Sequence, residues 1–230
     1  MARVAVVSFP GTNCDEDVVV AVHETTGLHA EVVWYTEYKA GIYDATILPG
    51  GFSYGDWLRA GAVAARTKTI DELRKDVENG TPVLGICNGF QILVEAELLP
   101  GALLANESGR FICRWIKTRV KNPKGPWLRL VKDNQEIHMP VAHGEGRYYI
   151  HEEEYAKIIA SASPVIYYLE GNNPNGSLHD IAGVGSANGQ VLGLMPHPER
   201  ASNRSLAPRG FTANGHLLFK SLEKSLKEGW

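Results

Sequence analysis

The chain has 230 residues, of which 44% are hydrophobic and 21% are charged, and this ordinary globular composition excludes extensive disorder. Its 23 basic and 26 acidic side chains give a net charge of −3, which argues against a basic nucleic-acid-binding protein. No apolar run approaches the roughly 18 residues of a membrane span, and the N-terminus lacks a signal-peptide layout. Three irregularly spaced cysteines do not form a disulfide framework, so we expect a reducing, cytoplasmic location.

Strands and helices alternate in the first half of the sequence. The near-continuous apolar run over 3–9 predicts a strand buried on both faces. Residues 15–26 fit a helix, because acidic side chains fill its first turn and Gly27 follows it. The same rules predict strands at 31–35, 45–48 and 82–86, and helices at about 56–79, broken near Thr67, and at 88–98. This order implies a parallel sheet with helices on both faces.

The second half changes character. Residues 111–120 alternate polar and apolar side chains, as in a half-exposed strand, and Asn188-Gly189 indicates a hairpin between 181–186 and 190–194. Further strands are predicted at 127–131, 141–142 and 148–150, and a closing amphipathic helix at 217–226. We expect a single α/β domain over residues 1–230, with a mainly parallel sheet, helices on both faces and an antiparallel addition in the second half.

Cys87 lies where a predicted buried strand meets a predicted helix. Gly85 and Gly89 flank it with the G-x-nucleophile-x-G spacing of a nucleophile elbow, with Cys in place of Ser. Larger side chains at the two flanking positions would collide in so tight a turn, and the positive end of the helix favours a thiolate. The alternative is a buried structural cysteine. The strand before Cys87 and the helix after it favour the nucleophile.

Cys14 and Cys113 are weaker candidates. Cys14 also precedes a helix, but the acidic residues at 15–17 disfavour a thiolate, and Thr12 and Glu16 stand where the elbow has glycines. Cys113 lies in an alternating strand. We interpret both as packing residues.

A cysteine nucleophile needs a base, and the base benefits from an orienting carboxylate. Two His-x-Glu pairs are present, His143–Glu145 and His197–Glu199. Prolines around His197 favour an extended chain, in which residues two apart point the same way, so we predict that Glu199 orients His197 toward Cys87. A surface histidine in a proline-rich loop is the alternative. The first pair, beside a glycine, fits a mobile loop that closes on substrate or touches a partner.

Acyl transfer also needs donors for a developing oxyanion. Pro49-Gly50-Gly51-Phe52 follows a predicted strand, and its glycines allow backbone N–H groups to approach a substrate, although an ordinary turn is the alternative. The N–H of Asn88, directly after Cys87, is the second predicted donor. Gln91 lies one helical turn after Cys87 and could bind a polar substrate, with a solvated helix position as the alternative.

Together these motifs resemble a known family. Gly85 to Gln91 (GICNGFQ), the Pro-Gly-Gly loop and the His-Pro-Glu sequence resemble the class I (triad) glutamine amidotransferases. More narrowly, the sequence is similar to the glutaminase subunits of phosphoribosylformylglycinamidine synthase, the PurQ type. The segments behind this narrower similarity are 9–15 (FPGTNCD), 50–56 (GGFSYGD), 59–61 (RAG), 106–115 (NESGRFICRW), 142–147 (AHGEGR) and 195–200 (MPHPER).

The resemblance implies a flavodoxin-like fold and hydrolysis of glutamine to glutamate and ammonia, with Cys87 as nucleophile, His197 as base and acid and Glu199 as orienting group. It implies that the ammonia passes to a separate synthetase subunit, bridged by a small third subunit. That partner would use ATP and Mg²⁺ to convert formylglycinamide ribonucleotide into formylglycinamidine ribonucleotide in purine biosynthesis. The chain itself has no G-x-x-x-x-G-K-[ST] loop and no CxxC or HExxH motif, so we expect no cofactor and no metal in it.

Further site residues are expected around this triad. Gly51 and Asn88 would supply the oxyanion donors. The residues expected near glutamine are Gly50, Phe52, Gln91, Asn106, Arg110 and Phe111. Those expected in a partner-binding or lid loop are His143, Glu145 and Arg147.

Three rival functions fit part of the sequence. A different cysteine hydrolase or chaperone-like protein would share the elbow but not the His-Pro-Glu sequence. A phosphate-binding module would use residues 11–13 at a helix N-terminus and would leave Cys87 without a role. A glutaminase that serves another synthetase would share the whole triad.

Overall fold

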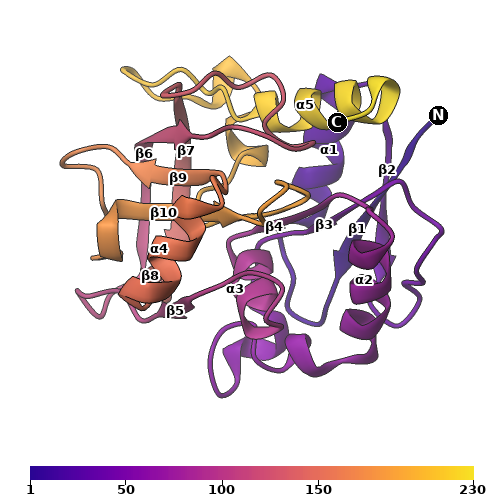
Figure 1. Ribbon diagram of the computed structural model, residues 1–230, viewed down its shortest axis with the longest axis horizontal. Coiled ribbons are helices and arrows are strands. Elements are labelled where there is room, and N and C mark those ends of the chain that lie inside the picture. The colour runs from indigo at the N-terminus through magenta and orange to yellow at the C-terminus, as the bar shows by residue number, and fades with distance from the viewer.

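Five parallel strands form one half of the molecule, in a computed structural model that describes residues 1–230 (Figure 1). They are β1 (Arg3–Ser8), β2 (His29–Trp34), β3 (Ala45–Leu48), β4 (Val83–Ile86) and β11 (Val191–Leu194). Their order in the sheet is β2-β1-β3-β4-β11, and every neighbouring pair is parallel. This is the strand order of the flavodoxin-like fold, which confirms the fold expected from the sequence.

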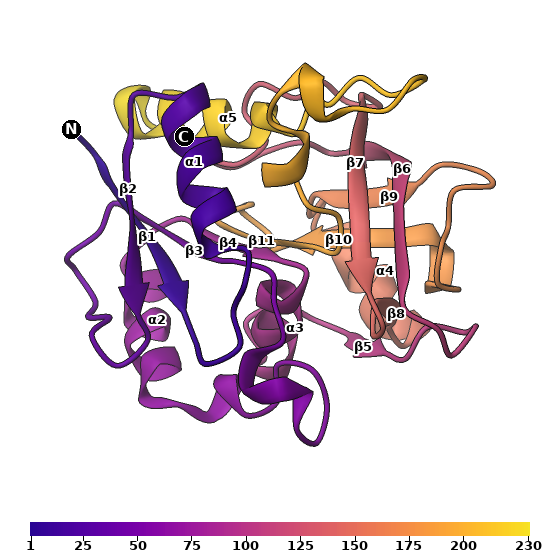
Figure 2. The same cartoon turned by 180° about the vertical axis from the view of Figure 1, so that it is seen from behind.

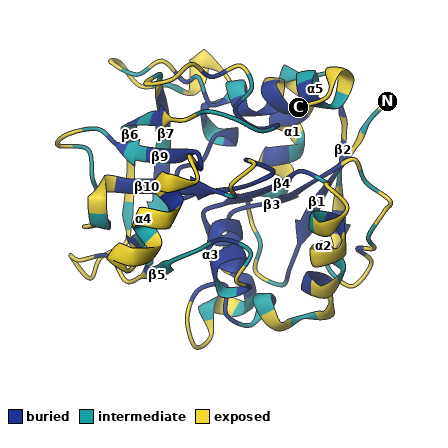
Figure 3. Ribbon diagram, in the orientation of Figure 1, coloured by how far each residue is buried: buried dark blue, intermediate teal, exposed yellow.

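Helices cover both faces of the parallel half. They are α1 (Asp15–Thr25), α2 (Lys68–Glu78), α3 (Asn88–Glu95) and α5 (His216–Glu228). α1 and α5 pack against each other on one face, and α2 and α3 lie on the other (Figures 1 and 2). Every residue of β3 and β4, which lie between these layers, is therefore buried, and these two strands are dark blue in Figure 3. Their apolar sequences are what burial on both faces requires.

The second half extends the same sheet with antiparallel strands. These are β6 (Ile112–Lys121), β7 (Glu136–His143), β9 (Val165–Tyr168) and β10 (Ile181–Gly185), and they continue the sheet as β11-β10-β9-β6-β7. β10 and β11 pair as the predicted hairpin. β5 (Ala102–Leu104) and β8 (Arg147–Tyr149) form a separate two-stranded sheet, and helix α4 (Glu152–Ala160) follows β8.

Several predicted elements differ from the structure. Residues 127–131 form no strand, because the Trp127 ring is buried in a turn and its Nε1 donates to Gln190 O over 3.1 Å. The helix predicted at 56–79 begins only at Lys68 and is preceded by the short 3₁₀ turns 53–56 and 64–66. Helix α4 was not predicted; it is short, and Ile158 is its one buried residue. Strands β5 and β9 were also missed, and both are short.

None of the helices combines the length and the apolar character that crossing a bilayer requires.

Candidate active site

The predicted chemical groups meet at the carboxyl ends of the parallel strands. The loop 9–14 follows β1, the loop 50–52 follows β3, Cys87 follows β4, and His197 lies three residues after β11. Since these strands are parallel, their carboxyl ends lie along one edge of the sheet, where open α/β sheets bind their ligands. The fold thus brings together groups that lie far apart in the sequence, such as Cys14 and Arg200, which are 186 positions apart.

Cys87 adopts the strained backbone of a nucleophile elbow. Its φ of 51° and ψ of −103° are unfavourable for a residue with a side chain. A Cβ on Gly89 would lie 1.9 Å from Leu48 O, and one on Gly85 would lie 2.7 Å from the Gly89 carbonyl carbon. The two glycines are therefore required by close approach, as the sequence predicted. Cys87 directly precedes α3, where the helix dipole favours an anion.

His197 and Glu199 form a buried pair. His197 Nδ1 lies 2.6 Å from Glu199 Oε1, and the two residues are 2% and 3% exposed. The extended geometry expected between them is wrong, because Pro198 has helical angles of −66° and −30° and Glu199 opens a 3₁₀ turn. The carboxylate meets the ring nonetheless. His197 is also held by its backbone N–H, which donates to Pro140 O over 2.8 Å.

The electrostatics of this pair favour a protonated imidazole. Burial by itself lowers the pKa of His197, but the Glu199 carboxylate and the Cys87 sulfur raise that pKa well above its ordinary value. A buried carboxylate in hydrogen-bond contact stabilises an imidazolium strongly. Cys87 is thus one of the groups whose charge favours the imidazolium, as expected of a nucleophile that works with a base.

The hydrogen bond expected between Cys87 and His197 is not formed in this conformation. Cys87, 4% exposed, has its sulfur 3.6 Å from Ala142 O, and His197 Nε2 is buried without a hydrogen-bond partner. With Nδ1 held by Glu199, Nε2 is the nitrogen that remains for proton transfer. Such bonds often tighten only when substrate binds.

Backbone donors lie beside the elbow. The N–H of Gly51 makes no hydrogen bond within the chain, and Asn88 is the first residue of α3, where N–H groups have no intrahelical partner. A Cβ on Gly50 would lie 2.7 Å from His197 Cε1, so Gly50 packs directly against the imidazole. The N–H groups of Gly51 and Asn88 are thus free of partners within the chain, and their role as oxyanion donors stays a prediction.

Most of the residues expected near glutamine are placed around the same region. Phe52 and Phe111 are exposed and their rings are 6.2 Å apart, and Arg110 is exposed. Gln91 is buried, and its amide is already bonded: Nε2 donates to Glu145 O over 2.5 Å, and Oε1 accepts from Asn88 Nδ2 over 2.9 Å. A role for Gln91 in binding glutamine stays a prediction.

Residues 142–147, here called the covering segment, run from the end of β7 to the start of β8 and contact Cys87 through Ala142 O, 3.6 Å from its sulfur. Side-chain amides hold the middle of this segment. Asn106 Nδ2 donates to His143 O over 2.8 Å, and Asn106 Oδ1 lies 3.0 Å from His143 Nδ1 and accepts from Gly146 N–H over 3.1 Å. Glu145 Oε2 accepts from Ala60 N–H over 3.1 Å. Asn106 is thus an anchor of this segment.

Arg147 and His143, near the two ends of the covering segment, are also held within the fold. Arg147 Nε donates to Ala105 O over 3.1 Å. His143 is buried, and burial together with the nearby charge of His197 lowers the pKa of His143 to about 4. His143 is therefore neutral near pH 7. The proposed mechanism needs a histidine that is held as an imidazolium. His197 fits this requirement, and neutral His143 does not.

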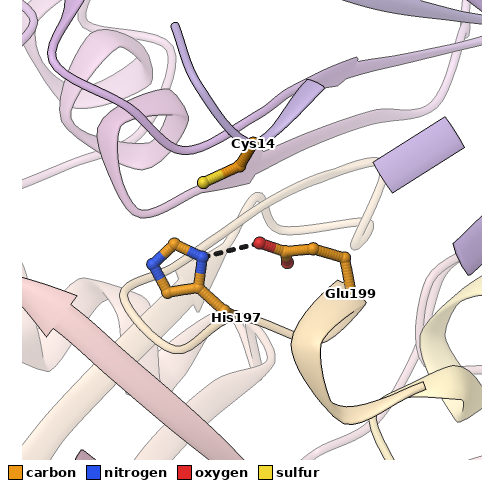
Figure 4. Close-up of side chains that lie close together, drawn as sticks. All are labelled: Cys14, His197 and Glu199. Carbon is orange, nitrogen blue, oxygen red and sulfur yellow. Dashed lines mark hydrogen bonds and ion pairs between the residues drawn. The ribbon is translucent and has the colours of Figure 1, made fainter. Parts of the chain in front are cut away.

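Cys14 is the site residue that sequence reasoning missed. Its sulfur and one ligand atom each of His197 and Glu199 lie within 4.8 Å of one another, as Figure 4 shows. These are metal-binding atom types, but here the imidazole and carboxylate bond to each other, and the sulfur accepts from Arg200 Nη2 over 3.0 Å. A local sequence pattern could not predict the contact between Cys14 and Arg200, because the two residues are 186 positions apart.

Comparison with known proteins assigns the family. The CobB/CobQ-like glutamine amidotransferase domain matches residues 1–222. The phosphoribosylformylglycinamidine synthase subunit PurQ of Pyrobaculum aerophilum is 52% identical over 208 residues, 90% of this chain and 92% of that protein. The same subunit of Pyrococcus horikoshii is 47% identical over 229 residues, 99% and 100% of the two chains. The chain belongs to the PurQ family of glutamine amidotransferases.

Solved structures agree with the PurQ assignment. The structure of PurLQS from Thermotoga maritima contains a chain with a TM-score of 0.85 and 42% identity, covering 98% of this chain and 100% of that one. A glutamine amidotransferase from Thermotoga maritima, 15% identical with a TM-score of 0.55, covers 98% of this chain and 92% of its own and shows the shared fold. The mostly parallel sheet with its antiparallel extension is thus a feature of PurQ-like chains.

Proposed function

We propose that this chain is the glutaminase subunit of phosphoribosylformylglycinamidine synthase and that Cys87, His197 and Glu199 are its triad. One observation carries the proposal: the elbow cysteine and a buried His–Glu pair follow two neighbouring parallel strands, β4 and β11, in a chain about half identical to PurQ subunits. A different cysteine hydrolase would not need this combination. If the chain were a phosphate-binding module, Cys87, His197 and Glu199 would have no function.

The reaction follows from the geometry. The Cys87 thiolate attacks the side-chain carbonyl carbon of glutamine, and the N–H groups of Gly51 and Asn88 hold the resulting oxyanion. The His197 imidazolium gives its proton to the departing nitrogen, so ammonia leaves and a thioester remains. His197 then takes a proton from water, which attacks the thioester and releases glutamate. The thiolate and the imidazolium are restored, and no external oxidant or cofactor is consumed.

The ammonia would pass to a synthetase subunit that makes formylglycinamidine ribonucleotide with ATP. The presence of a closely similar chain in a PurLQS structure supports a complex of this chain with a synthetase and a small bridging subunit. ATP and Mg²⁺ would bind the synthetase, since this chain has no nucleotide-phosphate loop.

The synthetase would control glutamine hydrolysis by changing the access of glutamine to Cys87. Cys87 is buried, its sulfur lies 3.6 Å from Ala142 O of the covering segment, and that segment bonds to Ala60 and Gln91. A free subunit that keeps this closed arrangement would release little ammonia, and docking of a synthetase on the neighbouring loops 53–59 and 143–147 would favour opening.

Glutamate release is the test. We expect low activity for the chain alone, a large rise when the synthetase and the small subunit are added, and none for Cys87→Ala in either case. Cys113→Ala, which changes the exposed cysteine, is the matched control and is expected to behave as the unaltered chain. Glutamate formation by Cys87→Ala, or full turnover without partners, would overturn the proposal.

A further inference from the structure

A second buried thiol lies behind the triad histidine. Cys14 ends the loop after β1 and precedes α1, and it is 1% exposed. Its backbone N–H donates to Gly50 O over 3.1 Å, so Cys14 is fixed to the loop that packs against the imidazole. A Cβ on Gly50 would meet both His197 Cε1, at 2.7 Å, and the Cys14 sulfur, at 3.1 Å. The sulfur therefore has little freedom to move.

The Cys14 sulfur has two hydrogen-bond partners of its own. It accepts from Arg200 Nη2 over 3.0 Å, and its thiol donates to Asn13 Oδ1 over 3.2 Å. Figure 4 shows the sulfur near the imidazole of His197, which in turn bonds to the carboxylate of Glu199. Cys14 thus lies between the guanidinium of Arg200 and the His197–Glu199 pair.

Arg200 is a potential competitor for the triad carboxylate. Its Nε lies 4.0 Å from Glu199 Oε1, and Glu199 Oε2 is buried with no hydrogen-bond partner. Arginine and carboxylate groups form strong bidentate pairs when they can. Arg200 has room to move, because it also lines a groove of about 730 Å³ between α1 and β6, where Asp17 is its other partner at 3.7 Å.

We propose that Cys14 is a positioning residue: its sulfur holds the guanidinium of Arg200 away from Glu199, so that the carboxylate stays committed to His197. This inference rests on the proposed function of His197 as acid and base. Without the sulfur, Arg200 would turn to the unpaired Glu199 oxygen and neutralise much of its charge. The imidazolium would then be held less strongly, and the ring less firmly oriented.

The charged and titratable groups that face His197 come from four parts of the fold. They are Cys87 after β4, Cys14 before α1, His143 at the end of β7, and Glu199 and Arg200 from the segment of His197 itself. Of these, only Arg200 is a cation at every relevant pH. It is therefore the group whose position most affects how well Glu199 stabilises the imidazolium.

The test first removes the Cys14 sulfur, which accepts from Arg200, and then removes the Arg200 guanidinium, which would compete for Glu199. In the complex with synthetase, we expect Cys14→Ala and the nearly isosteric Cys14→Val to lower kcat for glutamate release about tenfold, a common size for coupling within one hydrogen-bonded network, with little change in KM. Cys14→Ser keeps an acceptor and should retain most of the activity. Cys14→Ala combined with Arg200→Gln should recover most of the loss. Cys113→Ala is the matched control for cysteine removal.

A readout independent of turnover is the NMR titration of the His197 ring in the folded chain. We expect its midpoint to move to lower pH in Cys14→Ala and Cys14→Val and to return in the double variant. An unchanged midpoint in the single variants, or a double variant no better than Cys14→Ala, would overturn the inference. Because the titration needs only a folded chain, it tests Cys14 even if Cys87→Ala shows that the proposed function is wrong.

Discussion

The two halves of the sheet contribute to the site in different ways. In the parallel half, the reacting groups are fixed by backbone: Cys87 by a glycine elbow and His197 by a turn that follows β11. In the antiparallel half, the two ends of the covering segment pair within β7 and β8, and its middle is held largely by side-chain hydrogen bonds, chiefly those of Asn106 and Gln91. The difference teaches that the two parts of the site differ in how they can move: the elbow is fixed by close backbone packing, and the middle of the covering segment can be released by changing side chains, as the proposed dependence on a partner would require.

The largest effect should come from the triad itself. His197→Ala is expected to lower kcat about 10²–10⁴-fold, because it removes general acid–base catalysis. Glu199→Gln keeps the shape of the pair and should cost less. The measurement is glutamate release by the complex with synthetase. The matched comparison is the double variant His143→Ala, Glu145→Gln. If that variant released no glutamate while Glu199→Gln kept full activity, His143 and Glu145 would be the base and its orienting group, and the assignment to His197 and Glu199 would be wrong.

Glycine substitutions in the two halves should differ next. At Gly89 a Cβ would lie 1.9 Å from Leu48 O, whereas at Gly144 its nearest neighbour would be Phe111 at 3.8 Å. Gly89→Ala should therefore lower the free energy of unfolding by at least about 1–3 kcal/mol, and Gly144→Ala by under about 0.5 kcal/mol. Urea unfolding measures both. Equal costs would contradict the distinction between a rigid elbow and an adjustable segment.

Loosening the covering segment should expose the thiol. Asn106→Ala leaves buried partners without hydrogen bonds and should cost about 1–3 kcal/mol of stability. It should also speed alkylation of Cys87 in the isolated chain, which peptide mass spectrometry can follow. Gln135→Ala, in the turn before β7, is a control that leaves the segment fastened. Alkylation at the same rate in both variants would show that the segment does not limit access.

The smallest effect is a pH dependence in the antiparallel half. Burial lowers the pKa of His143 to about 4, below the value of about 6.5 expected for an unfolded chain. The stability that neutral His143 contributes is therefore fully present above pH 6.5 and is lost as the pH falls toward 4. The free energy of unfolding of the unaltered chain should fall more steeply over that interval than that of His143→Gln. Parallel slopes would contradict this assignment.

The sequence predicted most of what depends on neighbours along the chain. The βα order, the hairpin at 188–189 and the elbow around Cys87 follow from spacing over a few residues. The His197–Glu199 pair was also predicted, although its local geometry was not, because Pro198 is helical where an extended residue was expected. Local patterns thus fixed which residues could react but not every angle between them.

Contacts between distant segments were the part that sequence could not supply. The acidic residues after Cys14 indicated a poor site for a thiolate, yet Asp15 bonds to Ser8 Oγ over 2.7 Å and Asp17 lies 3.7 Å from Arg200. The group that faces the Cys14 sulfur is instead Arg200. In the same way, the apolar run 127–131 forms a buried turn because Trp127 bonds to Gln190, a partner that only the folded chain provides.

Covalent labelling with a diazo-ketone analogue of glutamine tests the central claim most directly. The complex is incubated with the analogue, digested, and mapped by mass spectrometry. The account predicts one adduct, on Cys87, that glutamine suppresses and that His197→Ala slows. An adduct on Cys14 or Cys113 that glutamine suppresses, with Cys87 unmodified, would contradict it.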